Sequence, residues 1–217
     1  SPEPWEDISK VLNDELGNRR SEIVSVNQVP IAAASIAQVH EAVLSNGSDV
    51  VIKIQRPGIR KKVIDDLKVM AWVAPKLVGK IPVAALANPP ALVELFAETI
   101  CEELDFKLEV ANLFEIKRVL YSNLKQEWEI PEPELGLVTE RVIVMTKISG
   151  VSLGDSIAMG IDSESSSVVF RQMVEGLLEG AVIHGIFHGD FHAGNVFLNK
   201  TGKIGLVDFG ITGRLDG

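Results

Sequence analysis

Cysteine is almost missing from this sequence, because Cys101 is the only one among its 217 residues. A single cysteine excludes a disulfide bond within the chain, which fits a reducing compartment. The first residues, SPEPWEDISK, lack the basic and apolar regions of a secretory signal peptide. No apolar run reaches the roughly 18 uninterrupted residues of a membrane-spanning helix, since Lys76 and Lys80 interrupt the nearest candidate, 69–87. We expect an intracellular protein of a bacterial cytoplasm, a mitochondrion or a plastid, and association with a membrane surface stays open.

Basic residues are outnumbered, with 21 lysines and arginines against 30 aspartates and glutamates and a net charge of −9. This balance disfavours binding to nucleic acid or to an anionic membrane through overall charge, so no nucleic-acid partner is expected. One basic stretch has no acidic residue between its members, which are Lys53, Arg56, Arg60, Lys61 and Lys62. It indicates either a solvated helix face or part of a binding site.

Hydrophobic periodicity predicts a β-rich first part with helices on either side. An amphipathic helix is expected over 5–17. Strands are expected over 39–44 and 49–55, and Asn46-Gly47 between them is a strong hairpin signal. A second helix is expected over 59–77.

A longer helical pattern follows over 91–121. Pro131 and Pro133 end it. A strand pair is then expected over 137–140 and 142–148.

A Gly/Asp/Ser-rich run, 149–167, is the predicted boundary between two domains, residues 1–148 and 149–217. After it we expect a helix over 168–184 and a short hairpin over 196–207. The order of elements predicts an α+β fold of two lobes, the first an antiparallel sheet with helices and the second truncated.

The strongest functional signal lies near the end of the chain: His188-Gly189-Asp190, then Asn195, then Asp208-Phe209-Gly210. Asn195 lies five positions after Asp190, the interval of the H-R-D-x-x-x-x-N loop that precedes D-F-G in protein kinases. Asp190 is therefore the candidate general base or substrate-orienting group. Asn195 and Asp208 are candidate ligands of a divalent metal, since oxygen ligands suit hard cations such as Mg.

Lys53 ends the run Val50-Val51-Ile52-Lys53, which matches the V-A-I-K strand of kinases. In that strand the lysine binds nucleotide phosphates and pairs with a helix glutamate. A strand lysine is otherwise an ordinary solvated edge residue. The acidic residues available on the long helix are Glu102, Glu103, Asp105 and Glu109. They form either a solvated acidic face or a cluster that meets Lys53 and a cation.

A glycine-rich loop, usual between the first strands of a nucleotide-binding kinase, is missing. Ala32-Ala33-Ala34-Ser35-Ile36-Ala37-Gln38 stands in its place. Alanine does not adopt positive φ as glycine does, so a flexible flap over phosphates is not expected. On composition alone such a stretch is helix or core.

His184, His188 and His192 recur every four residues, a spacing that suggests zinc. The glycines among them, Gly185 and Gly189, oppose one continuous helix. We favour a bracing role for His188 in the catalytic loop over a zinc site.

Together these motifs resemble those of the UbiB family of atypical protein-kinase-like proteins, which includes the ADCK-type proteins of mitochondria and plastids. The matching segments are PIAAASIAQVH (30–40), VVIKIQRPG (50–58), EELDFKLEVAN (102–112), FHGDFHAGN (187–195) and VDFG (207–210). The resemblance implies a protein-kinase-like fold that binds ATP or ADP with Mg or Mn. It further implies a role in the biosynthesis of ubiquinone-type isoprenoid quinones or related lipids, with lipid-biosynthetic enzymes or a lipid surface as partners.

The resemblance also assigns residues. It makes Ala32, Ala33, Ala34 and Ser35 the nucleotide loop, and Lys53 the phosphate lysine. Glu103 of Glu103-Leu104-Asp105 becomes the ion-pair partner of Lys53 and a catalytic residue, and Glu109 a further acidic position for cation handling. Asp190, Asn195 and Asp208 keep the catalytic and metal roles. The hinge 144–148 would meet the adenine through Met145 and Lys147.

Three features depart from the family. A K-x-G-Q motif before the alanine-rich loop is absent, only seven residues follow Gly210, and Thr146-Lys147 stands where relatives often have acidic and aromatic residues. The sequence therefore predicts a fragment of a longer protein.

Three functions stay open. The first is an ATP-binding atypical kinase or ATPase of the UbiB type. The second is a nucleotide-gated pseudokinase scaffold for lipid-biosynthetic enzymes. The third is a small-molecule phosphotransferase of the aminoglycoside or choline type, which shares the H-G-D loop.

Overall fold

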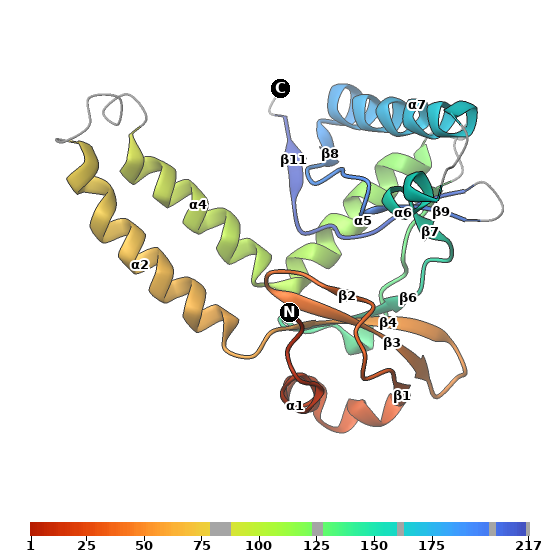
Figure 1. The fold of residues 1–217 in the computed structure, drawn as a ribbon, viewed down its shortest axis with the longest axis horizontal. Helices are drawn as coiled ribbons and strands as arrows, with labels where there is room; N and C mark the ends of the chain where they lie inside the picture. The colour runs from red at the N-terminus through yellow and green to blue at the C-terminus, as the bar shows by residue number, and fades with distance from the viewer. Residues whose placement is uncertain (79–87, 123–127, 160–162, 200–202, 216–217) are drawn as a thin grey trace.

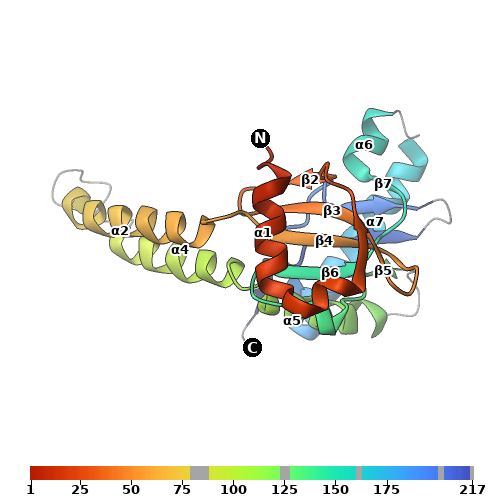
Figure 2. The same ribbon diagram turned by 90° about the horizontal axis from the view of Figure 1, so that it is seen from below.

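The computed structural model describes residues 1–78, 88–122, 128–159, 163–199 and 203–215. The first sheet is antiparallel, in the order β1-β3-β4-β6, and β2 pairs with the N-terminal end of β3. Its strands are β1 (Ile23–Val26), β2 (Ala32–Ala33), β3 (Ala37–Leu44), β4 (Asp49–Gln55) and β6 (Val142–Thr146). β3 and β4 form the hairpin that Asn46-Gly47 predicts. Helix α1 (Trp5–Leu16) crosses one face of this sheet (Figure 2).

The first core lies between α1 and the sheet. Ile8 and Leu12 of α1 are fully buried, as are Val50, Ile52 and Ile54 of β4. Since side chains alternate along a strand, Val51 and Lys53 point to the opposite face of β4. The sheet thus has one face filled by α1 and one face available to the rest of the chain.

Two helices form a hairpin that extends away from the body of the molecule (Figures 1 and 2). They are α2 (Ile59–Val78) and α4 (Pro89–Glu103). Helix α5 (Phe106–Ser122) then runs back into the body. Over the described residues, no helix is long and apolar enough to cross a membrane.

The single helix predicted over 91–121 is wrong, because the chain breaks between α4 and α5 at Leu104-Asp105. Leu104 is buried, and its carbonyl accepts a hydrogen bond from Gln55 Nε2 at 2.9 Å. The Asp105 side chain accepts the N–H of Lys107 at 3.0 Å, which starts a new helix. A tertiary contact and a local cap therefore end a pattern that is continuous in the sequence.

The second half of the chain contains two small sheets. One has the order β5-β10-β9-β7, and the other pairs β8 with β11. The strands are β5 (Trp128–Glu129), β7 (Val151–Ser152), β8 (Ile186–His188), β9 (Val196–Leu198), β10 (Ile204–Leu206) and β11 (Thr212–Arg214). The helices are α6 (Leu153–Ala158), α7 (Ser163–Glu179) and a π-turn, η3 (Gly180–His184).

The second core includes residues that precede the predicted domain boundary. Leu113 and Ile116 of α5 and Trp128 of β5 pack with Leu206 and Phe209. The division of the chain at residue 148 stays a prediction.

Several predicted elements differ from the structure. The strand over 137–140 is wrong, since a 3₁₀ turn, η2 (Leu135–Leu137), stands there and the Thr139 hydroxyl accepts the N–H groups of Arg141 and Val142. The helix predicted over 168–184 begins at Ser163 and ends at Glu179. The alanine-rich stretch is not a helix: Ala32–Ala33 is an exposed strand, whereas Ala37 is buried in the core at the start of β3. The turn predicted at 200–202 lies outside the described residues.

Gly150 lies where the chain that leaves the first sheet passes close to the backbone of β9. Its φ is +122°, and a Cβ placed there would lie 2.2 Å from the Leu198 carbonyl oxygen. We expect Gly150→Ala to lower the free energy of unfolding by about 2 kcal/mol or more, since strain and overlap add. Urea unfolding measures this. Gly136→Ala is the matched control, because nothing lies within 4 Å of its position, and a loss as large there would contradict the explanation.

Candidate active site

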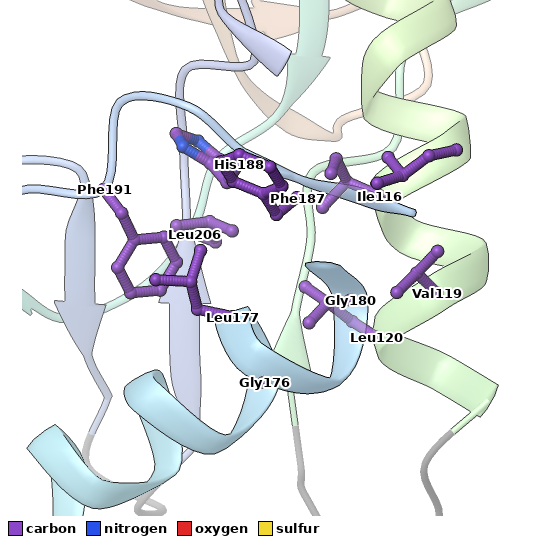
Figure 3. Close-up of a pocket in the computed structure, with 11 residues that line it drawn as sticks. Ile116, Val119, Leu120, Gly176, Leu177, Gly180, Phe187, His188, Phe191 and Leu206 are labelled. Atoms are coloured by element: carbon purple, nitrogen blue, oxygen red, sulfur yellow. The ribbon is translucent and has the colours of Figure 1, made fainter. Parts of the chain in front are cut away.

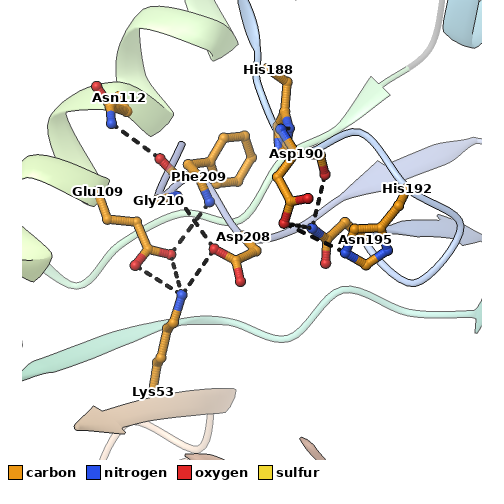
Figure 4. A network of polar contacts seen from close by, with 10 residues as sticks. All are labelled: Lys53, Glu109, Asn112, His188, Asp190, His192, Asn195, Asp208, Phe209 and Gly210. Carbon is orange, nitrogen blue, oxygen red and sulfur yellow. Dashed lines mark hydrogen bonds and ion pairs between the residues drawn. The ribbon is translucent and has the colours of Figure 1, made fainter. Parts of the chain in front are cut away.

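Lys53 is the centre of a buried polar network (Figure 4). Its Nζ donates to Glu109 Oε1 at 2.7 Å, to Glu109 Oε2 at 2.9 Å and to Asp208 Oδ1 at 3.0 Å. Lys53 and Glu109 are 7% and 6% exposed. β4 lies between β3 and β6, so Lys53 is not a solvated edge residue. Three segments distant in sequence therefore meet at one ammonium group.

The network determines the charges of Lys53 and Asp208. Burial alone would lower the pKa of Lys53, but the carboxylates of Glu109 and Asp208 outweigh it and raise that pKa above its usual value. Burial opposes ionisation of Asp208, yet Lys53 holds the pKa of its carboxyl below the usual range. Lys53 is therefore a cation and Asp208 an anion at neutral pH.

Glu109 occupies the position beside Lys53 that the family resemblance assigns to Glu103. Glu103 is the last residue of α4, and no ion pair joins it to Lys53 in the described structure. Burial raises the pKa of Glu103, and the negative charge of Asp208 adds to this effect. The helix break between the two glutamates explains the difference, because it turns α5 so that its first turn faces β4.

The loop after β8 brings Asp190 and Asn195 together. Asn195 Nδ2 donates to the Asp190 carbonyl oxygen and to Asp190 Oδ2, both at 3.1 Å. His192 Nε2 lies 3.5 Å from the same carboxylate, whose side chain is 43% exposed. Asp190 is thus held in place and remains accessible to a substrate.

His188 braces this loop, the role favoured over a zinc site. It is 4% exposed, its Nδ1 accepts the N–H of Asp190 at 3.2 Å, and its ring meets Phe209 edge-on at 5.4 Å. His184 instead contacts Ser122 at 3.2 Å. The three histidines contact different groups: His184 the Ser122 hydroxyl, His188 the N–H of Asp190 and His192 the Asp190 carboxylate.

The donor set fits a divalent cation. Among the described residues, no three His, Cys, Asp or Glu side chains already form a metal cage. However, the negative charges of Asp208, Asp190 and Glu109 all act on Glu103, against the single cation Lys53. Such an excess of carboxylate favours a bound cation, and oxygen donors suit Mg or Mn. Asn195 and Asp208 stay the predicted ligands.

The alanine-rich turn lies in line with Lys53 across the sheet. Ala32 is opposite Val39 of β3, Val39 is opposite Lys53 of β4, and Lys53 is opposite Ile143 of β6. The predicted nucleotide residues Ala32, Ala33, Ala34 and Ser35 therefore stand two strands from the lysine. Their role in binding stays a prediction.

Arg56 holds this turn in a fixed shape. Its Nε donates to the Ala34 carbonyl oxygen at 3.0 Å, and its backbone N–H donates to Ile36 at 2.8 Å. The N–H of Ala34 donates to Ala37 at 2.9 Å. Because these backbone groups already have partners, the turn is less free to close over phosphates than a glycine loop.

The predicted hinge residues have separate environments. Met145 is 6% exposed and packs with Val51 and Phe106. Lys147 Nζ forms an ion pair with Glu41 at 2.5 Å. Their contact with an adenine ring stays a prediction.

Gln55 is a residue of the site that motif analysis missed. It is fully buried two positions after Lys53, and its Nε2 donates to Leu104 at 2.9 Å and to Glu140 at 3.1 Å. Lys53 and Gln55 share one face of β4, so β4 holds both the start of α5 and the break before it. The QRPG segment, 55–58, was the feature of the sequence that could have indicated this role for Gln55.

The basic stretch that contains this segment is not one helix face. Lys53 is buried, whereas Arg60 and Lys61 are exposed and form ion pairs with Glu140 and Asp65.

A small apolar pocket lies between α5, α7 and β8 (Figure 3). Ile116, Leu120, Leu177 and Phe187 contribute to its wall, and His188 is its polar member. It offers no set of polar groups for a ligand, so we interpret it as a gap in packing beneath the loop that carries Asp190.

The fold and site together define a protein-kinase-like domain. Residues 1–217 match the ABC1 atypical kinase-like domain, and the chain belongs to that family. A similar curated protein is an uncharacterized Mycobacterium tuberculosis protein, 34% identical over 217 residues, covering 99% of this chain and 44% of that protein. The probable protein kinase UbiB of Vibrio cholerae is 34% identical over 193 residues, covering 86% and 35%. The chain thus spans less than half the length of these relatives.

Solved structures agree on the fold. The Mycobacterium tuberculosis protein Rv3197, in a complex with erythromycin, has a TM-score of 0.82 and 29% identity, covering 98% of this chain and 53% of that one. The Rio2 kinase of Chaetomium thermophilum, in an ADP/Mg²⁺-phosphoaspartate complex, has a TM-score of 0.52 and 16% identity, covering 92% and 52%. These likenesses confirm the predicted α+β kinase-like fold.

Proposed function

We propose that this chain is the nucleotide-binding part of a UbiB-type atypical kinase or ATPase that uses ATP or ADP with Mg or Mn. The observation that carries the proposal is Lys53 held between Glu109 and Asp208, at the meeting point of β4, α5 and the segment after β10. Lys53 would meet the nucleotide phosphates, and Asp208 with Asn195 would hold the metal ion. When bound, that ion neutralises charge that develops on the phosphates.

Asp190 would orient the attacking group or accept its proton, because its carboxylate is accessible and is held by Asn195. Asp208 contacts Lys53 through Oδ1, so its second carboxylate oxygen would be the one that meets the metal ion.

The fixed alanine turn supports restrained turnover. A turn whose backbone groups are already bonded to Arg56 and Ala37 cannot close around phosphates as a glycine flap does. The second candidate, a nucleotide-gated scaffold for lipid-biosynthetic enzymes, draws on this same observation. ATP hydrolysis by the full-length protein, with membrane lipid present, separates the two candidates.

The biological setting we propose is the biosynthesis of isoprenoid quinones or related lipids, at a lipid surface or beside the enzymes of that pathway. It rests on relatives named UbiB and on the family as a whole. We expect no nucleic-acid partner, given the net charge of −9.

A third candidate is a small-molecule phosphotransferase. It is favoured by one observation, that the similar protein Rv3197 was solved with erythromycin, which carries an amino sugar. Calorimetric titration with erythromycin, alone and with MgATP, tests it. Binding that requires MgATP would support this candidate, and no heat of binding would remove it.

We expect MgADP or MgATP to raise the melting temperature of the full-length protein by about 5 °C or more at roughly 100 times Kd. The physical reason is that ligand binds only the folded state. Lys53→Ala should abolish the shift relative to its own baseline. Lys61→Ala, an exposed lysine paired with Asp65, is the control and should keep it. An unshifted wild type, or an equal shift in Lys53→Ala, would show that the proposal is wrong.

A further inference from the structure

Helix α5 holds the Asp208 segment by more than the Lys53 ion pair. Glu109 and Asn112 are three positions apart, so they share one face of α5. Glu109 Oε1 accepts the N–H of Phe209 at 3.4 Å, and Asn112 Nδ2 donates to the carbonyl oxygen of Phe209 at 3.2 Å (Figure 4). Both backbone polar groups of Phe209 are thus bound by side chains of a single helix.

Arg214 determines which way the Asn112 amide points. Arg214 Nη2 donates to Asn112 Oδ1 at 3.2 Å and to Glu115 Oε2 at 2.7 Å. A guanidinium group has donors and no acceptor, so only the amide oxygen can face it. The amide nitrogen must then face Phe209, where the partner is a carbonyl oxygen. A flipped amide would place its N–H groups against the Arg214 donor and its oxygen against the Phe209 carbonyl oxygen, so neither hydrogen bond could form.

The backbone that this contact restrains is in an unfavourable conformation. Asp208 has φ of +62°, in the left-handed region that is unfavourable for a non-glycine residue. Such a conformation persists only where the surroundings determine it. Phe209 is 1% exposed against His188, which fixes its ring, and the Asn112 contact fixes its carbonyl.

We propose that Asn112 is a positioning residue that pins Phe209 to α5 and so holds the Asp208 carboxylate in place before a ligand arrives. The role of Asp208 as a metal ligand rests on the proposed function, whereas the pin itself does not. Asn112 precedes the segment by nearly a hundred positions, and Arg214 follows it. Because Asn112 contacts both Phe209 and Arg214, it links α5 to the segment itself and to the strand after it. A metal ion then meets a carboxylate that needs little reorganisation.

Hydrogen exchange of the ligand-free protein tests the pin. In Asn112→Ala we expect amides within 207–212 to exchange about tenfold faster, as for the loss of one net hydrogen bond. Amides of 113–120 should be unchanged, since alanine favours a helix more than asparagine does. Asn112→Asp should act alike, because an ionised carboxylate accepts from Arg214 but cannot donate to Phe209. Arg118→Ala, an exposed residue of the same helix, is the control.

Exchange within about twofold of wild type in both variants, against the tenfold expected for one hydrogen bond, would overturn the pin. A second arm measures ADP affinity of the full-length protein with and without Mg. We expect the gain in affinity from Mg to fall about tenfold in Asn112→Ala, with Mg-free affinity unchanged. Faster exchange together with an unchanged gain in ADP affinity from Mg would show that Asn112 does not position Asp208 for a metal ion. A wild type that binds no MgADP would remove the proposed function, while the exchange arm would still decide the pin.

Discussion

Lys53→Met is expected to lower the free energy of unfolding by about 3–5 kcal/mol, the cost of leaving a buried charge without its partner. Lys53 is the cation that contacts both Glu109, which is 6% exposed, and Asp208. Methionine retains the apolar stem and removes only the ammonium. Urea or guanidinium unfolding followed by circular dichroism measures the loss.

A second substitution shows that the loss arises from the uncompensated charge. Adding Glu109→Gln to Lys53→Met should recover a large part of the stability, because the glutamine amide is neutral. Lys61→Met is the matched control, since the Lys61 side chain is 84% exposed and its pair with Asp65 contributes little. A loss in Lys53→Met no larger than in this control would rule out a buried, coupled charge. Nucleotide binding should be absent from the single and the double variant alike.

The pH dependence follows from the three shifted groups of the network, Lys53, Asp208 and Glu109. The folded pKa of Lys53 lies above its unfolded value of about 10.4. Its contribution is therefore complete below about pH 10 and is lost as the pH rises through the folded pKa. The folded pKa of Asp208 lies below its unfolded value of about 3.9. Its contribution is present above about pH 4 and is lost as the pH falls through the folded pKa. Burial raises the pKa of the Glu109 carboxyl above its usual value, so Glu109 is the first of the three groups to lose its charge as the pH falls, and it sets the acid limit of the network.

Asp208→Asn is expected to lower metal-dependent ATP hydrolysis of the full-length protein by about 10²–10³-fold, equivalent to several kcal/mol of charge stabilisation. Asparagine keeps the shape of the side chain and an oxygen that accepts from Lys53, so the fold should be preserved. The charge that a divalent cation requires is removed. Steady-state hydrolysis across a Mg titration measures the effect.

The same variant distinguishes loss of metal from loss of nucleotide. ADP binding in the presence of EDTA should be close to wild type, because Lys53 and Glu109 remain. Asp65→Asn, on the exposed surface of α2, should leave both measurements unchanged. Hydrolysis that persists in Asp208→Asn would show that Asp208 is not a metal ligand.

Local patterns in the sequence predicted much of the fold. The β3–β4 hairpin follows from Asn46-Gly47 between two β-branched runs, and α1 follows from its apolar stripe. These signals act between near neighbours, where turn geometry and helical spacing are decided. The break at Leu104 depends on a local cap, in which the Asp105 side chain accepts the N–H of Lys107, and on a hydrogen bond from Gln55, about fifty positions earlier. No local pattern shows the second of these contacts.

The candidate site also has a part that the sequence predicts and a part that depends on tertiary packing. Lys53, Asp190, Asn195 and Asp208 are recognisable because their chemistry requires particular residue types at particular intervals. The contact of Glu109 with Lys53, and that of Asn112 with Phe209, depends on how α5 is turned against β4. No interval in the sequence encodes that rotation.

The sequence by itself determined the family, the kinase-like order of elements and the residues that carry charge, since these depend on residue type and short-range spacing. Only the tertiary structure decided that Glu109 rather than Glu103 is paired with Lys53, that the alanine turn is held by Arg56, and that Asn112 faces the Asp208 segment. The physical reason is that ion pairs and hydrogen bonds form between atoms about 3 Å apart. Such proximity is set by the packing of helices and strands that lie far apart along the chain.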